Sequence, residues 1–133
     1  MESPAGVVTY LLDTNAIIYH LRGAVQLDPF FAEFARGTAE PVISIITQIE
    51  LLGFARLTSR EEARIRALLA NFSIREVDAE IAEKAVAFRR RYRLGVPDCI
   101  IAATAWLLDA CLVSRDTGLG RISGIRLINP FAA

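Results

Sequence analysis

Short apolar runs alternate along the chain with longer segments in which apolar residues recur every three or four positions. Runs of the first kind are typical of strands buried on both faces, and the second spacing is typical of helices packed on a core. The predicted strands are Val7–Leu12, Val42–Ile45, Phe72–Val77, Cys111–Ser114 and Arg126–Ile128. The predicted helices are Thr14–Leu21, Pro29–Arg36, Thr47–Arg56, Ser59–Ala70, Ala79–Tyr92 and Pro97–Ala110.

This alternation predicts an α/β fold with a parallel sheet covered by helices on both faces. The chain has 133 residues and contains no repeat or linker, so residues 1–133 are expected to form one domain. Ligands of such sheets bind beyond the carboxyl ends of the strands. Asp13 and Asp116 follow two of the predicted strands, which makes that edge the candidate site.

Composition adds limits to this interpretation. The net charge is zero, so bulk charge gives no indication of a nucleic-acid partner, although fourteen of the fifteen basic residues are arginines. The longest apolar stretch, Cys99–Leu108, is shorter than the roughly 20 residues that cross a bilayer. The start of the chain carries Glu2 and lacks the basic segment of a leader. Two isolated cysteines form no disulfide framework, and we expect a soluble cytoplasmic protein without membrane contact.

Four acids are the candidate catalytic residues: Asp13, Glu50, Asp98 and Asp116. Each has a structural alternative. Asp13 could cap the helix that begins at Thr14, and Glu50 has capping-box spacing from Thr47. Asp98 falls in a first helical turn, where the helix dipole favours a carboxylate, and Asp116 could be an ordinary turn acid.

Together the four acids are more informative, because all fall at strand-to-helix junctions on one edge of the predicted sheet. Carboxylates gathered there would repel one another unless a cation held them, and oxygen ligands favour Mg²⁺ or Mn²⁺ over zinc. The single histidine, His20, is not expected to be a ligand. Glycine-rich phosphate loops and nucleophile-elbow motifs are missing from the sequence, which leaves metal-assisted hydrolysis of phosphodiesters as the favoured chemistry.

Four stretches of the chain are informative together: YLLDTNAII (10–18), SIITQIELL (44–52), YRLGVPDCIIAATA (92–105) and LVSRDTGLGRISGIRLINPF (112–131). With these stretches the chain resembles the PIN-domain family, and within it the VapC-type toxins of toxin–antitoxin pairs. The resemblance covers nearly the whole chain. It implies a doubly wound fold around a short parallel sheet of about five strands. It also implies Mg²⁺- or Mn²⁺-dependent endoribonuclease activity, a homodimer and a cognate antitoxin.

The resemblance also implies roles for individual residues. Asp13, Asp98 and Asp116 would hold the metal, and Glu50 would be a ligand or would steer the attacking water. Asp116 matches the less regular fourth acid of the family. This chain departs from the commonest pattern there, since Leu119-Gly120 stands where an Asp-Phe pair is common.

Further residues are expected around these acids. Asn15 and Ser114 would orient the metal-binding acids, and Arg115 and Arg121 are candidates for contacts with the RNA substrate. A docking surface for the antitoxin could come from Phe30, Phe31 and Phe34, which could equally be core residues.

Three other functions stay open at this point. A phosphatase of the haloacid-dehalogenase type needs a second Asp two residues after the first, where this chain has Asn15. A receiver domain needs a Lys at the end of a late strand, and Lys84 falls within a predicted helix. A PIN-like module could also bind RNA without cutting it.

Overall fold

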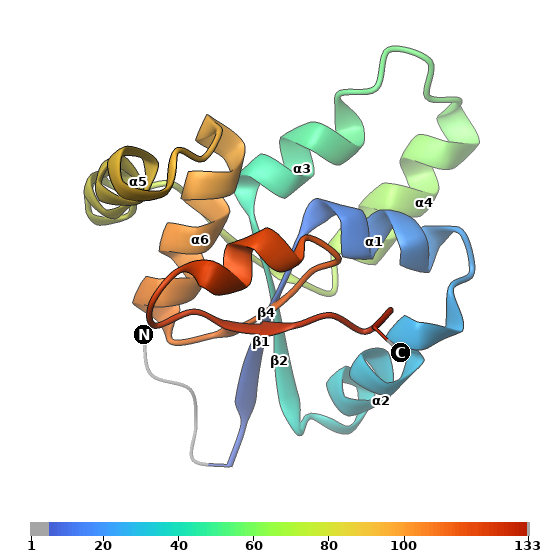
Figure 1. The fold of residues 1–133 in the computed structure, drawn as a ribbon. Coiled ribbons are helices and arrows are strands. Elements are labelled where there is room, and N and C mark those ends of the chain that lie inside the picture. Colours follow the sequence, from blue (N-terminus) through green and yellow to red (C-terminus); the bar gives the residue numbers. More distant parts are fainter. Residues whose placement is uncertain (1–5, 133) are drawn as a thin grey trace.

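The computed structural model describes residues 6–132, so Glu2 and the rest of the first five residues lie outside it. Its centre is a five-stranded sheet in the order β3-β2-β1-β4-β5, with every neighbouring pair parallel. The strands are β1 (Val8–Leu12), β2 (Ala39–Ser44), β3 (Ser73–Arg75), β4 (Cys111–Val113) and β5 (Arg126–Ile128). The expected α/β fold with about five parallel strands is confirmed (Figure 1).

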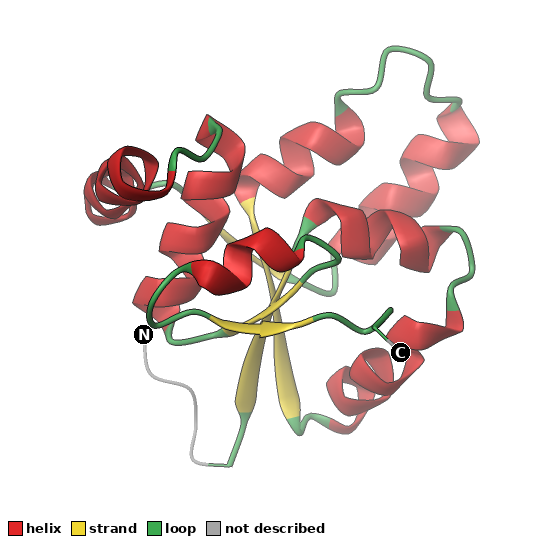
Figure 2. Cartoon of the chain, viewed as in Figure 1, coloured by secondary structure: helices red, strands yellow, loops and turns green. Residues whose placement is uncertain are grey.

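Helices cover both faces of the sheet (Figure 2). One face carries α5 (Ala79–Tyr92) and α6 (Val96–Leu108), and the other carries α1 (Thr14–Leu21), α2 (Asp28–Arg36) and α4 (Ser59–Leu69). The short helix α3 (Ile45–Leu52) follows β2 directly. In Figure 1, α1 and α3 leave the same edge of the sheet, the edge at which β1 and β2 end.

Alternation along the strands separates the core into two clusters of buried side chains. In β1, fully buried Leu11 packs with the residues of α5 and α6, and its neighbour Leu12 packs with those of α1 and α4. Leu112 and Val113 of β4 divide in the same way. Burial of both strand faces explains why the strands are continuous apolar runs in the sequence.

Several boundaries differ from the sequence prediction. Strand β2 begins at Ala39 instead of Val42. Its first three residues, up to Pro41, pair with β1 alone, and the short β3 pairs with β2 only from Val42 onward. Helix α3 begins at Ile45 and stops before Gly53. Ser44 caps it, because the Ser44 hydroxyl accepts a hydrogen bond from the backbone N–H of Ile46 in the first turn. Two 3₁₀ turns were not predicted: η1 (Val25–Leu27) and η2 (Thr117–Arg121).

The phenylalanines of α2 are partly buried and pack on other aromatic rings, and two of them, Phe31 and Phe34, also line a surface pocket. Phe30 meets Tyr10 edge-on at 5.1 Å between ring centroids, and Phe34 meets Phe72 at 6.0 Å. Phe31 stacks on His20 at 3.8 Å. These partly buried rings pack against the second core cluster, so the core role is present, and docking of an antitoxin on them stays a prediction. Within the described residues, no helix is both long and apolar enough to cross a membrane.

The loop before β5 generates a prediction about stability. Gly124 has a φ of +88°, and a Cβ built on it would lie 2.6 Å from Nε1 of Trp106. The Lys84 ammonium lies 3.6 Å from the centroid of the Trp106 ring, so displacement of the ring would also disturb this contact. Gly124→Ala is therefore expected to lower the free energy of unfolding by about 1–3 kcal/mol, as measured by urea denaturation.

Gly120→Ala is the matched control for this substitution. A Cβ at Gly120 would lie 3.4 Å from Cδ2 of Leu127, which is an ordinary contact. Equal stability of the two variants would contradict the steric argument.

Candidate active site

Asp13 lies at the carboxyl end of β1, where it is also the residue that caps α1. Its backbone N–H donates to the Val113 carbonyl at 2.9 Å, so the end of β1 is fixed to β4. The side chain is buried, with 7% of its surface exposed. Burial raises the pKa of Asp13, and the charges of Asp98 and Glu50 raise it further, while hydrogen bonds from Ser114 and Thr14 lower it.

Ser114 and Asn15 hold this carboxylate from two elements. The fully buried Ser114 hydroxyl donates to Asp13 Oδ2 at 2.8 Å and accepts the Asp116 backbone N–H at 2.9 Å. Asn15 Nδ2 donates to Ser114 Oγ at 3.3 Å and lies 3.5 Å from Asp13 Oδ2. The two residues expected to orient the acids thus lie in direct contact with Asp13.

Glu50 is exposed on α3 and points towards α1. Its Oε1 accepts a hydrogen bond of 2.6 Å from the Thr14 hydroxyl, and the Thr14 and Thr47 hydroxyl oxygens are 3.0 Å apart. The capping-box alternative for Glu50 is wrong, because Thr47 lies inside α3 and Ser44 is the cap. The hydrogen bond from Thr14 therefore holds Glu50 at the start of α1, next to Asp13.

Asp98 lies in the first turn of α6, three residues after the capping Gly95. It is partly buried, and this burial raises its pKa; the negative charges of Asp116 and Glu50 add to the increase. Asp116 is exposed, and its Oδ1 accepts the Gly118 N–H at 3.0 Å as the cap of η2. The turn role considered for Asp116 is therefore present, together with an electrostatic influence on Asp98.

The four acids influence one another electrostatically, but their side chains do not converge closely on one point. Across residues 6–132, no three His, Cys, Asp or Glu side chains lie close enough to form a ready-made metal-binding group. The donor set nevertheless suits a divalent cation, since it offers oxygen atoms alone and contains a buried carboxylate that two other acids destabilise. Mg²⁺ keeps several of its waters in proteins, so ligands that are spread apart fit a hydrated ion.

The two candidate arginines lie in the segment that contains Asp116. Arg115 is exposed, and its backbone N–H donates to Asn15 Oδ1 at 3.1 Å. Arg121 is exposed in η2, where its Nε donates to the Gly118 carbonyl at 3.1 Å. Sequence reasoning did not single out Tyr19, whose hydroxyl accepts a hydrogen bond from Arg115. The available signal was helical spacing, because Tyr19 comes four residues after Asn15 in α1.

The family model described as the PIN domain matches residues 10–125. The chain belongs to the PIN-domain family. A solved structure described as a toxin–antitoxin complex from Klebsiella pneumoniae contains a chain 33% identical to this PIN domain. The match covers 93% of this chain and 99% of that one, with a TM-score of 0.75. The resemblance found in the sequence is thereby confirmed.

More distant structures share the fold of this PIN domain. VapBC2 from Rickettsia felis, bound to a promoter DNA fragment, matches at 21% identity and a TM-score of 0.80, covering 92% of this chain and 98% of that one. FitAcB from Neisseria gonorrhoeae matches at 24% identity and a TM-score of 0.76, with 93% and 99% covered. A search of curated protein sequences gives no match.

Family membership sets aside the phosphatase and receiver alternatives. The position of Lys84 agrees, because this residue lies within α5 with its ammonium group over the Trp106 ring. His20 stacks on Phe31 and is partly buried, and this burial lowers its pKa. Neither side chain joins the acids at the sheet edge.

The raised pKa of Asp13 predicts a pH dependence of stability. An acid whose pKa is higher in the folded state stabilises the fold below its unfolded pKa, here near 3.8, and this contribution is lost as the pH rises through the folded pKa. In EDTA, the free energy of unfolding of the wild type relative to Asp13→Asn should therefore decrease as the pH is raised from about 4 towards neutral. Urea denaturation over this range measures it, and a difference that grows in favour of the wild type would contradict the interpretation.

Proposed function

We propose that this PIN domain is a Mg²⁺- or Mn²⁺-dependent endoribonuclease and the toxin of a toxin–antitoxin pair. The observation that carries the proposal is the buried Asp13 carboxylate, whose charge is opposed by Asp98 and Glu50, while no cationic side chain among residues 6–132 stabilises it. Such an arrangement costs stability unless a cation binds, and it is typical of functional sites.

Each acid has a distinct position from which to act. Asp13, Asp98 and Asp116 would hold the ion, with Ser114 and Asn15 fixing the orientation of Asp13. A bound divalent cation would neutralise phosphate charge and lower the pKa of a water molecule. Glu50 is exposed and held by a single hydroxyl, so a second carboxylate oxygen is available to orient the attacking water.

An antitoxin is the proposed protein partner, supported by the Klebsiella toxin–antitoxin complex at 33% identity.

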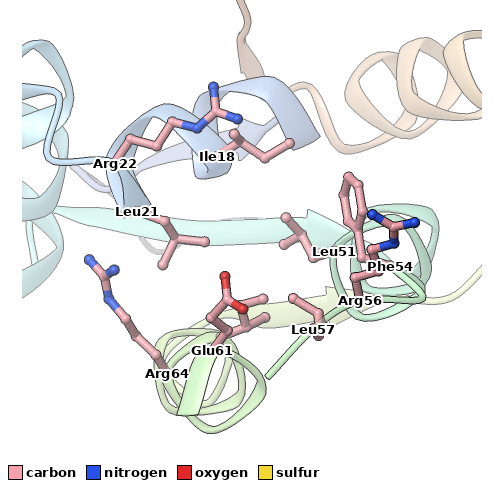
Figure 3. Close-up of a pocket in the computed structure, with 10 residues that line it drawn as sticks. Ile18, Leu21, Arg22, Leu51, Phe54, Arg56, Leu57, Glu61 and Arg64 are labelled. Carbon is pink, nitrogen blue, oxygen red and sulfur yellow. The ribbon is translucent and has the colours of Figure 1, made fainter. Parts of the chain in front are cut away.

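An open pocket of about 380 Å³ between α1, α3 and α4 is suited to binding this antitoxin. Figure 3 shows Leu21, Leu51 and Leu57 facing this pocket, with arginines at its margin. The pocket includes three arginines and one acid: Arg22, Arg56, Arg64 and Glu61. This chemistry fits a partner helix with apolar anchors and flanking acidic residues. Homodimerisation stays a prediction.

Substitution of the acids tests the catalytic proposal. Glu50→Gln should lower the rate of RNA cleavage by about 10²–10⁴-fold, and Asp13→Asn or Asp98→Asn should abolish cleavage. Asparagine is a good helix cap, so Asp13→Asn should fold. Mn²⁺ alone should raise the melting temperature of the wild type but not that of Asp13→Asn.

The control for these variants is Glu83→Gln, which lies exposed on α5 and should behave as the wild type. A fully active Asp98→Asn protein would contradict the assignment of the acids. A wild type that binds RNA but never cuts it with Mg²⁺ or Mn²⁺ would instead support the non-catalytic module.

A negative charge introduced into the pocket tests the partner. Phe54 lines the pocket and is 64% exposed, so Phe54→Asp should leave the fold intact while it abolishes co-purification with the product of the reading frame immediately upstream. RNA cleavage should be unchanged. The control is Val25→Asp, since Val25 is 69% exposed and lies outside the pocket. Equal co-purification of both variants would exclude this docking site.

A further inference from the structure

Arg115 is attached to the candidate site through its backbone. It lies between Ser114 and Asp116, and its N–H donates to Asn15 Oδ1 at 3.1 Å. Asn15 also donates to the Ser114 hydroxyl that holds Asp13. A shift of Arg115 would therefore disturb the contacts of the buried carboxylate, and its main chain is fixed relative to the acids.

The guanidinium of Arg115 turns towards two aromatic rings instead of the neighbouring acids. Its Nη1 donates to the Tyr19 hydroxyl. Its central carbon lies 5.1 Å from the Tyr19 ring centroid and 6.0 Å from that of Phe131. The two rings are themselves in contact, with centroids 4.7 Å apart. This arrangement fixes the direction of a long side chain that would otherwise be mobile.

The charge of Arg115 is also uncompensated. The ion pairs formed by residues 6–132 involve Arg66, Arg75 and Arg126, each with a nearby acid. Arg115 takes part in none of these pairs, although Asp116 is its neighbour in the chain. A guanidinium has five N–H donors in a planar fork, and the contact with Tyr19 uses one of them. An exposed, oriented cation with free donors suits a phosphate group.

We propose that Arg115 binds a phosphate of the RNA strand adjacent to the phosphate that is cut, and that Tyr19 and Phe131 are positioning residues for it. The inference rests on the proposed ribonuclease function. A ribonuclease needs cationic contacts that attract RNA, because four carboxylates repel a polyanion and this chain has no net positive charge to offset them. Tyr19 and Phe131 contact each other and are partly buried, so they support the arginine and do not offer a free face for a base.

The test measures binding of a fluorescent single-stranded RNA oligonucleotide in EDTA over a range of salt concentrations. Loss of one phosphate contact should reduce the steepness of log K against log salt by about 0.7. Arg115→Gln should show this change together with about 5–20-fold weaker binding. Arg115→Lys should keep the slope. Tyr19→Phe should also keep the slope but bind more weakly, because the charge remains while its hydroxyl anchor is lost.

The matched control is Arg36→Gln, at the exposed end of α2, which precedes the amino end of β2. It should bind as the wild type. In cleavage assays with Mg²⁺ or Mn²⁺, Arg115→Gln should raise KM and leave kcat nearly unchanged, which is the signature of lost uniform binding. Its melting temperature should match that of the wild type.

Failure of this inference is distinguishable from failure of the ribonuclease proposal. If the wild type cuts RNA and Arg115→Gln keeps the wild-type salt slope, Arg115 only anchors the C-terminal residues and the inference is wrong. The same holds if Arg115→Gln weakens co-purification with the upstream gene product without changing the salt slope. If the wild type neither binds nor cuts RNA, both proposals fall.

Discussion

Parallel pairing of all five strands is the constraint on which the other features of this domain depend. Each parallel connection must return the chain across a face of the sheet, so helices cover both faces and the strand interiors are apolar. The same constraint brings the ends of β1, β2 and β4 to one edge. Asp13 and Ser114 come directly after β1 and β4, and Ser44 at the end of β2 starts the helix that carries Glu50. Residues distant in sequence meet there because all strands of a parallel sheet end at the same edge.

Electrostatics at this edge oppose the stability that the core provides. Burial of Asp13 and the charges around it raise its pKa, and Asp98 is affected in the same direction. Two neutral hydrogen bonds from Thr14 and Ser114 offset only part of the cost. Proteins retain such unfavourable arrangements where function requires them, and the family to which this chain belongs agrees with a functional origin.

Sequence pattern was sufficient for the elements that the core defines. The apolar runs of β1 and β4 and the periodicity of α1 and α5 predicted those elements to within one or two residues, because burial dictates both pattern and structure. The bounds of α3 were wrong, since Ser44 and Thr47 are equally plausible caps until the end of β2 is known. The turn η2 depends on the Asp116 cap, which the local sequence does not distinguish from a metal ligand.

The same limit applies to the candidate site. Its acids were found from their place after predicted strands, whereas the contacts of Thr14 with Thr47 and of Arg115 with Tyr19 join segments 33 and 96 residues apart. Only the folded arrangement shows such pairs. Asp13 also shows why the alternatives for one residue need not exclude each other, because it caps α1 while its carboxylate remains beside Asp98 and Glu50.

The double role of Asp13 has an evolutionary consequence. Asparagine and aspartate are almost equivalent as helix caps, so genetic drift from one to the other at this position removes a buried charge while the start of α1 is preserved. Lineages descended from such a change would inherit an intact scaffold, with the α1–α3–α4 pocket still formed. The fold thus permits paralogues that lose the chemistry proposed for the sheet edge without first losing their shape.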